Sequence, residues 1–403
     1  MNGPLTALEN PFILRRAIIA LSAGAFGSGM SMRVTDPMLL RLSSDFDIPL
    51  GLAAWVITIF GVAYGCSQLL FGPLGDRYGK YRVIAWACLA CALSALLCGL
   101  TTEFTGLLLA RALAGATAAA VIPLSMAWIG DVIPYDNRQS VLARFLVGQI
   151  LGLSAGVLVG GWCADYLDWR TPFFLLTAWF FVVGCYLIHL NGLLPASARA
   201  LHQVKGSALA RLVAEFRAVL AVPWARTVLL TVLIEGGLVF VAVAFLPTHL
   251  HTVYSLSISS AGALVMLFGL GGLIFAACSR CLVRQMGEAG LTRYGSVLMA
   301  MSMLAIAYSP HWWITLPACL GLGLGFYMMH NTLQINATQM APERRGAAVA
   351  AFASCFFLGQ STGVALGGGL VAFTGTAHLI AAAGLGVFLT GASFSKQLLS
   401  KTV

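Results

Sequence analysis

The sequence predicts an all-α membrane protein with twelve transmembrane helices in two pseudo-symmetric six-helix bundles. Hydrophobic residues make up 59% of the chain and charged residues only 9%, which leaves too few polar groups to cover a soluble domain. Apolar stretches of about 18–25 residues, long enough to cross about 30 Å of hydrocarbon, recur throughout the 403 residues. A ten-residue pattern also occurs twice, 207 positions apart, which indicates two related halves.

Twelve apolar stretches can be placed, and the loops between them are too short for a large soluble domain. The first six cover 17–38, 52–72, 83–101, 105–129, 141–162 and 171–193. The second six cover 225–248, 259–279, 292–309, 312–335, 347–372 and 376–395. The predicted domains are an N-terminal bundle over 1–194, a cytoplasmic linker over 195–223 and a C-terminal bundle over 224–403. Leucine and valine spacing within the linker suggests a short amphipathic helix on the membrane surface, and the alternative is a plain covalent tie that carries positive-inside charge.

Charge predicts the orientation of these spans. Of 23 Lys and Arg residues, only Arg41 and Arg170 fall in loops on one side, and Arg33 and Arg111 lie within spans. The other 19 lie at or near the opposite face, which the positive-inside rule makes cytoplasmic. We therefore expect a multi-pass protein of the cell (inner) membrane with both termini in the cytoplasm. The net charge of +9 reflects this topology, so no nucleic-acid partner is expected.

The repeated pattern reads GLSAGVLVGG over 152–161 and GQSTGVALGG over 359–368. Glycines at every fourth position place a bare stripe on one helix face, where a neighbouring backbone can approach closely. The predicted helix-packing residues are Gly152, Gly156, Gly160, Gly161, Gly359, Gly363, Gly367 and Gly368.

Arg33, Asp36, Arg111 and Glu235 lie within the predicted spans, where ionisable residues are costly and therefore functional candidates. Asp36 in the first span and Arg111 in the fourth reach similar depths in the outer half at 1.5 Å per residue. Asp36 can pair with Arg111, or with Arg33 one turn deeper. An ion pair that only fixes helix packing is the alternative.

Glu235, near the middle of the seventh span, has no basic residue at its depth in its own half. Burial disfavours the charged form of an isolated carboxylate, so we expect Glu235 to be largely protonated and to exchange its proton readily. The first and seventh spans occupy equivalent positions, so Glu235 is a candidate partner for Arg33 in one conformation.

The tenth span carries a polar face in its cytoplasmic half. Its members are Tyr327, His330, Asn331 and Gln334, and their three- and four-residue spacing places them on one side of a helix. Tyr64 and Gln68 form a smaller polar pair in the second span. Lining a substrate cavity and hydrogen bonding to neighbouring helices are both open readings.

The loop after the second span reads GPLGDRYGKYRVI over 72–84 and is expected to reverse the chain in a four- to six-residue polar turn. It resembles the signature loop of the major facilitator superfamily, with matches at Gly72, Asp76, Arg77, Gly79 and Lys80. The resemblance implies a conformational latch between the halves on the cytoplasmic side, in which Asp76 faces a helix N-terminus.

The glycine pattern of the fifth span is similar to the antiporter motif of drug:proton exporters in that superfamily, with Val157 in place of the usual proline. The resemblance implies a proton-coupled secondary transporter, and not an enzyme, that works by alternating access. We expect export of a small organic molecule, either a drug-like amphiphile or a secreted metabolite such as a siderophore. A proton-coupled importer, a lipid flippase and a non-transporting receptor are the alternatives.

Glu235 and Asp36 are the proton-coupling candidates, and Arg33 and Arg111 supply charge to the cavity. No cofactor is expected, since the proton gradient drives transport. No metal is expected either, because Cys278 and Cys281 have ligand spacing without a second pair. The expected partners are a small-molecule substrate, protons and the lipid bilayer, and the expected state is a monomer.

Overall fold

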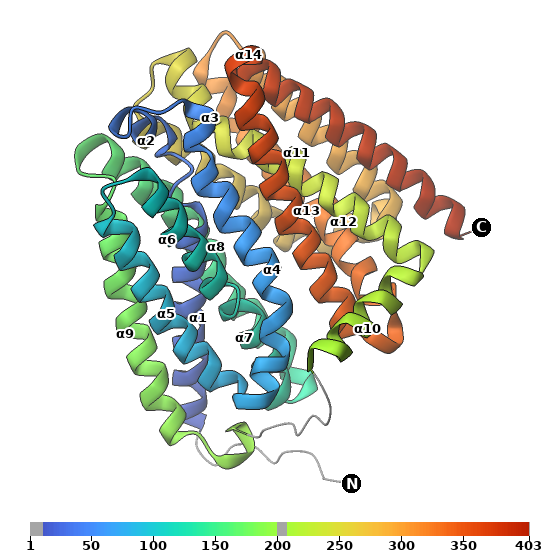
Figure 1. Ribbon diagram of the computed structural model, residues 1–403. Helices are drawn as coiled ribbons and strands as arrows, with labels where there is room; N and C mark the ends of the chain where they lie inside the picture. The colour runs from blue at the N-terminus through green and yellow to red at the C-terminus, as the bar shows by residue number, and fades with distance from the viewer. Residues whose placement is uncertain (1–10, 200–207, 403) are drawn as a thin grey trace. The chain divides into compact units, whose positions relative to one another are not determined.

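The computed structural model of the chain describes residues 11–199 and 208–402, which are almost entirely helical and contain no strand. Figure 1 shows the helices in order. The first part of the chain forms α1 (Pro11–Arg33), α2 (Leu39–Asp45), α3 (Leu50–Ala53), α4 (Trp55–Tyr78), α5 (Lys80–Leu100), α6 (Phe104–Ala118), α7 (Val121–Val132), α8 (Tyr135–Tyr166) and α9 (Thr171–Leu193). After the short helix η1 (Ala196–Arg199) come α10 (Ala208–Ala221), α11 (Pro223–Tyr254), α12 (Ile258–Tyr308), η2 (Trp312–Ile314), α13 (Thr315–Gln339), η3 (Pro342–Arg344) and α14 (Arg345–Thr402).

Within the described residues, ten helical stretches are long and apolar enough to cross a membrane. Two of the underlying helices are unusually long, with 51 residues in α12 and 58 in α14. Each is interrupted by a glycine with positive φ, Gly287 at 62° and Gly375 at 70°, a backbone conformation that costs other residues more than glycine. The predicted spans 259–279 and 292–309 lie on either side of Gly287, and 347–372 and 376–395 lie on either side of Gly375.

The helix of the predicted linker is present as α10. The remainder of that linker includes residues 200–207, which lie outside the described residues.

Two boundaries differ from the sequence-based expectation. The first helix ends at Arg33, so Asp36 lies in the turn before α2 and not within a helix. Pro37 explains this end, because a proline disfavours the α conformation of the residue before it. Helix α4, which forms the second predicted span, instead continues through Asp76 to Tyr78. The expected polar turn of four to six residues is therefore wrong. The chain reverses at Gly79 alone, which has a φ of 90°.

The chain forms two compact units, which we describe separately. Unit 1 contains residues up to Arg33, Val62–Gly156 and Arg170–Ala208. Unit 2 contains Val34–Gly61, Val157–Trp169 and the chain from Leu209 onward. Unit 2 therefore combines short segments of the first half with the second half. The division of the chain into bundles at 195–223 stays a prediction.

In unit 1, α5 packs between α9 and α6, and α1 also packs on α9 (Figure 1). The Tyr81 ring of α5 contacts the Trp128 ring of α7 with centroids 4.9 Å apart. The Trp128 indole nitrogen donates a hydrogen bond of 3.0 Å to the carbonyl of Ala198 in η1. Two buried aromatic side chains, of which Trp128 is hydrogen-bonded through its indole N–H, thus fix the end of this unit nearest the linker.

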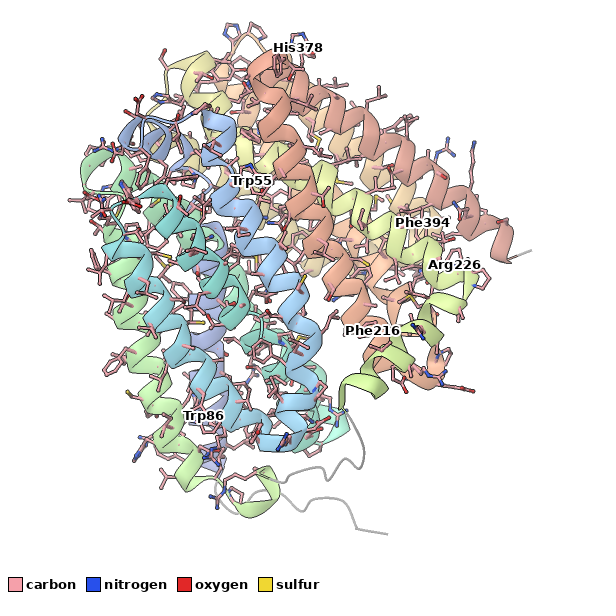
Figure 2. All side chains as sticks on the ribbon, viewed as in Figure 1. Trp55, Trp86, Phe216, Arg226, His378 and Phe394 are labelled. Carbon is pink, nitrogen blue, oxygen red and sulfur yellow. The ribbon has the colours of Figure 1, made fainter. Side chains whose placement is uncertain are left out.

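In unit 2, α11 packs along α14 and α12 packs along α13. At the start of α11, Trp224 stacks on Phe394 of α14 with ring centroids 5.6 Å apart, and Phe394 is labelled in Figure 2. The same end of the unit is joined to α10 by an ion pair of 3.1 Å between Arg344 and Glu215. These contacts hold the helices that carry Glu235 and the polar face of α13.

Candidate functional site

A buried carboxylate and a histidine meet in unit 2. Glu235 of α11 has no exposed surface, and its Oε2 atom lies 2.8 Å from Nδ1 of His330 on α13. A proton held between these atoms makes the pair either an ion pair or a neutral hydrogen-bonded pair. The other carboxylate oxygen, Oε1, is buried without a hydrogen-bond partner among the described residues. Among the described residues, a hydrogen bond therefore reaches only one of the two carboxylate oxygens of Glu235.

The prediction that Glu235 lacks a partner in its own half is therefore wrong. For His330 the sequence leaves two roles open, lining a substrate cavity or hydrogen bonding to a neighbouring helix, and the contact with Glu235 is a hydrogen bond of the second kind. The signal that could have found the pair is approximate depth, since Glu235 lies ten residues from the cytoplasmic start of its predicted span and His330 lies in the cytoplasmic half of the tenth span.

Aromatic rings pack against the histidine of this pair. The His330 ring stacks on Phe326 with centroids 4.9 Å apart, and it also contacts Phe356 at 4.8 Å. Phe240 contacts both of these phenylalanines edge-on, at 5.6 and 5.3 Å. We define the aromatic cluster as Phe240, Phe268, Phe326, Tyr327, Phe352 and Phe356, which come from α11, α12, α13 and α14. In this apolar setting the interaction between the carboxylate and the imidazole is stronger than it would be in water.

The remaining polar residues of α13 differ in their exposure. Tyr327 and Asn331 are half-buried beside His330, whereas Gln334 is exposed. Sequence reasoning missed Asn336, two residues after Gln334, whose side-chain amide donates a hydrogen bond of 2.9 Å to Glu288 of α12. This contact ties α13 to α12 near the cytoplasmic ends that the topology predicts.

The second polar pair lies in unit 1. Tyr64 on α4 is buried and Gln68 is half-buried. The Gln68 side-chain oxygen is buried and lacks a hydrogen-bond partner among the described residues.

The charged residues of the first half are divided between the units. Arg111 of α6 is fully buried, and its Nη1 atom donates a hydrogen bond of 3.0 Å to the backbone carbonyl of Ser31 on α1. Arg33 is buried at the end of α1 in the same unit. Asp36 is also buried but belongs to unit 2. Pairing of Asp36 with either arginine stays a prediction, as does a contact between Arg33 and Glu235.

The signature residues form an ionic chain at the junction of α4 and α5. Lys80 lies 3.8 Å from the carboxylate of Asp76 and 2.5 Å from that of Asp131 on α7. The Arg77 guanidinium lies over the Tyr78 ring, 5.1 Å from its centroid. Within unit 1, the chain therefore connects three helices at the end where the positive-inside rule predicts cytoplasm. A latch to the other half stays a prediction.

The first glycines of each repeat copy lie at close helix contacts within their own half. A Cβ atom added to Gly156 would lie 2.6 Å from the Met30 carbonyl oxygen, and one added to Gly152 would meet the carbonyl of Phe26. In the second copy, Gly359 and Gly363 face the carbonyls of Leu233 and Gly237 in the same way. The positions that these glycines face are again 207 residues apart, so the duplication extends to the packing.

Comparison with known proteins supports one family. The family model of the major facilitator superfamily matches residues 21–364. The MFS-type transporter YceJ of Bacillus subtilis is 25% identical over 382 residues, covering 94% of each chain. The multidrug export protein EmrB of Escherichia coli is 29% identical over 39% of this chain and 31% of its own. The puromycin resistance protein pur8 of Streptomyces alboniger is 35% identical over 33% of this chain and 27% of its own.

Solved transporter structures share the fold at low sequence identity. The nucleoside transporter NupG aligns with a TM-score of 0.75 and 13% identity over 94% of this chain and 98% of its own. The peptide transporter POT, solved in complex with sulfate, aligns with a TM-score of 0.75 and 16% identity over 96% and 94% of the two chains. These relatives and structural neighbours are transporters and not enzymes. The chain therefore belongs to the major facilitator superfamily of multi-pass membrane transporters.

Proposed function

We propose that this transporter is a proton-coupled exporter of small amphiphilic organic molecules in the cell membrane. The observation that carries the proposal is the contact of the buried Glu235 with His330, whose ring packs against the aromatic cluster. Two of its relatives are named for multidrug export and puromycin resistance. The proposed exporter acts as a monomer and uses no cofactor, because the proton gradient supplies the energy.

The proposed topology has twelve spans in two six-helix bundles with both termini in the cytoplasm. The non-helical Gly287 and Gly375 divide α12 and α14 into two segments each, and each segment is long enough to cross a bilayer once. Two crossings for each of these helices raise the ten apolar stretches to twelve spans. An even number of spans places both termini on one side.

In the proposed cycle, Glu235 carries the coupling proton. When Glu235 is ionised, its contact with His330 stabilises the negative charge of the carboxylate, which would be costly if unpaired in a low-dielectric environment. Protonation of Glu235 removes that charge and weakens the interaction with His330. Substrate and proton then compete for the same pair, which gives antiport: binding of one favours release of the other.

The aromatic cluster suggests the part of the substrate that binds there. Flat apolar groups pack against the faces and edges of Phe326 and Phe356, and aromatic pairs of this type contribute about 0.5–1.5 kcal/mol each beyond area burial. A positively charged substrate also interacts favourably with ionised Glu235 and with the ring faces. Arg33, Arg111 and Asp36 would complete the charge balance of the outer half of the cavity.

The direction of coupling can be tested with purified protein in proteoliposomes. Ethidium is a suitable probe because its permanent charge prevents passive accumulation as a weak base. With an acidic lumen, an antiporter releases protons outward and accumulates ethidium, and a protonophore abolishes the accumulation. Vesicles without protein are the control. Accumulation only when the external buffer is acidic would indicate symport and contradict the proposal.

A further inference from the structure

The final glycine of each repeat copy contacts the opposite half of the sequence. In the first copy, a Cβ atom on Gly160 would meet the carbonyl of Val34 in its own half. A Cβ atom on Gly161 would instead lie 2.9 Å from the carbonyl oxygen of Ile258 and 3.2 Å from Cα of Ser259, at the start of α12. The end of α8 and the start of α12 both belong to unit 2.

The second copy repeats this arrangement. A Cβ atom on Gly367 would meet the Val241 side chain in its own half, and one on Gly368 would lie 2.8 Å from the Gly51 carbonyl oxygen in the first half. Gly51 and Ile258 are themselves 207 positions apart, the period of the repeat. The two contacts are therefore equivalent by pseudo-symmetry, and both require a residue without a side chain.

An acidic residue strengthens only the first of these contacts. Asp165, one turn after Gly161, accepts hydrogen bonds from the backbone N–H groups of Ile258 at 3.2 Å and Ser259 at 2.6 Å. Ser257 accepts a third from the N–H of Ser260. The carboxylate thus satisfies two of the free donors at the N-terminus of α12, where the helix dipole favours negative charge.

The equivalent position in the second copy is Ala372, which has no polar side chain. Ala372, Gly51, Gly368 and Trp55 line a cavity of about 680 Å³ in unit 2, and Trp55 is labelled in Figure 2. The two equivalent contacts are therefore unequal: one carries a charged cap, and the other adjoins a cavity.

We propose that Asp165 is a conformational latch on the side of the membrane opposite the linker. Its two hydrogen bonds join the end of α8, in the first half, to the start of α12, in the second half. Gly161 of α8 and Gly262 of α12 allow the two helix ends to approach closely enough for these bonds. For the central cavity to open on that side by alternating access, the two ends must separate and these bonds must break. The latch does not depend on the substrate or on the coupling ion proposed above.

Two substitutions grade the strength of the latch. Asp165→Asn removes the charge but keeps one acceptor oxygen. Asp165→Ala removes the charge and both acceptor oxygens. Charge-assisted hydrogen bonds are roughly twice as strong as neutral ones, so the effect should increase from the wild type through Asn to Ala. Gly161→Ala is an independent steric variant, since its methyl group would crowd the Ile258 carbonyl. Glu103→Gln is the control, because Glu103 is an exposed carboxylate on the same predicted side.

The first readout is hydrogen–deuterium exchange of the full-length protein in lipid nanodiscs. The amides of Ile258 and Ser259 should exchange several-fold faster in both Asp165 variants and at the wild-type rate in Glu103→Gln. The second readout is the distance between spin labels at exposed positions 166 and 253, in a background with the exposed cysteines replaced by serine. A longer-distance population should grow in the order wild type, Asn, Ala, and should also appear in Gly161→Ala.

Faster amide exchange with unchanged label distances in all variants would show that Asp165 only caps a helix, and this would overturn the latch. Unchanged exchange would contradict the hydrogen bonds themselves. If Asp165→Ala does not fold, Asp165→Asn and Gly161→Ala still decide the outcome.

Discussion

At the scale of single residues, the contact between Glu235 and His330 is expected to have a large effect on stability. Glu235 is fully buried and uses only one of its two oxygens in the contact with His330. Removing one partner of a buried pair leaves an uncompensated polar group, which commonly costs about 3–5 kcal/mol. Replacing both partners with apolar side chains is often close to neutral.

We therefore expect His330→Leu to lower the unfolding temperature of the purified protein markedly. The double variant Glu235→Leu/His330→Leu should recover most of that loss, because no buried charge remains. Differential scanning fluorimetry in detergent measures both effects. Strictly additive losses in the double variant would mean that the two side chains do not interact.

The ionic chain of Asp76, Lys80 and Asp131 gives a second prediction at this scale. Asp76 and Asp131 are partly exposed at a helix junction, where ion pairs contribute about 0–1 kcal/mol to stability. Asp76→Asn should consequently leave expression and folding nearly unchanged. If Asp76 also latches the halves on the cytoplasmic side, the variant should lose transport, and the accessibility of cysteines to maleimides from the cytoplasmic side should rise. Normal flux with unchanged cysteine accessibility would mean that Asp76 only pairs with Lys80 and does not latch the halves.

At the scale of helices, the glycine stripes determine how closely neighbouring backbones approach. Carbonyl groups of α1 face the stripe on α8, and carbonyl groups of α11 face the stripe on α14. The sequence predicted these stripes from their four-residue spacing alone. It could not indicate that the last glycine of each copy contacts the other half, because that depends on how the helix ends are arranged in space.

Gly156→Leu and Gly363→Leu should each abolish transport, because a branched side chain would push the paired helices apart. Gly369→Leu is a matched control on the same helix as Gly363, since a Cβ atom there meets nothing within 4 Å. Uptake assays with equal amounts of folded protein compare the three variants. Wild-type activity in both packing variants would refute the requirement for close approach.

At the scale of the whole molecule, hydropathy and the internal repeat predicted the helical membrane class and the duplicated helix packing. The ends of helices were less predictable. Pro37 ends α1 before Asp36, and Gly79 replaces a longer turn because one glycine with positive φ is enough to reverse the chain. The partner of Glu235 was missed because a pairing between α11 and α13 depends on helix rotation, which hydropathy does not specify.

The central claim is that Glu235 carries the coupling proton, and the most direct test is the neutral mimic Glu235→Gln in proteoliposomes. A gradient of about two pH units supplies about 2.7 kcal/mol per proton, enough for about hundredfold accumulation with one proton per substrate. Wild-type protein should accumulate ethidium toward that limit. Glu235→Gln should retain substrate exchange across the vesicle membrane but lose gradient-driven accumulation. Uphill pumping by Glu235→Gln, with Asp36→Asn folded yet unable to pump, would contradict this claim and assign the proton to Asp36.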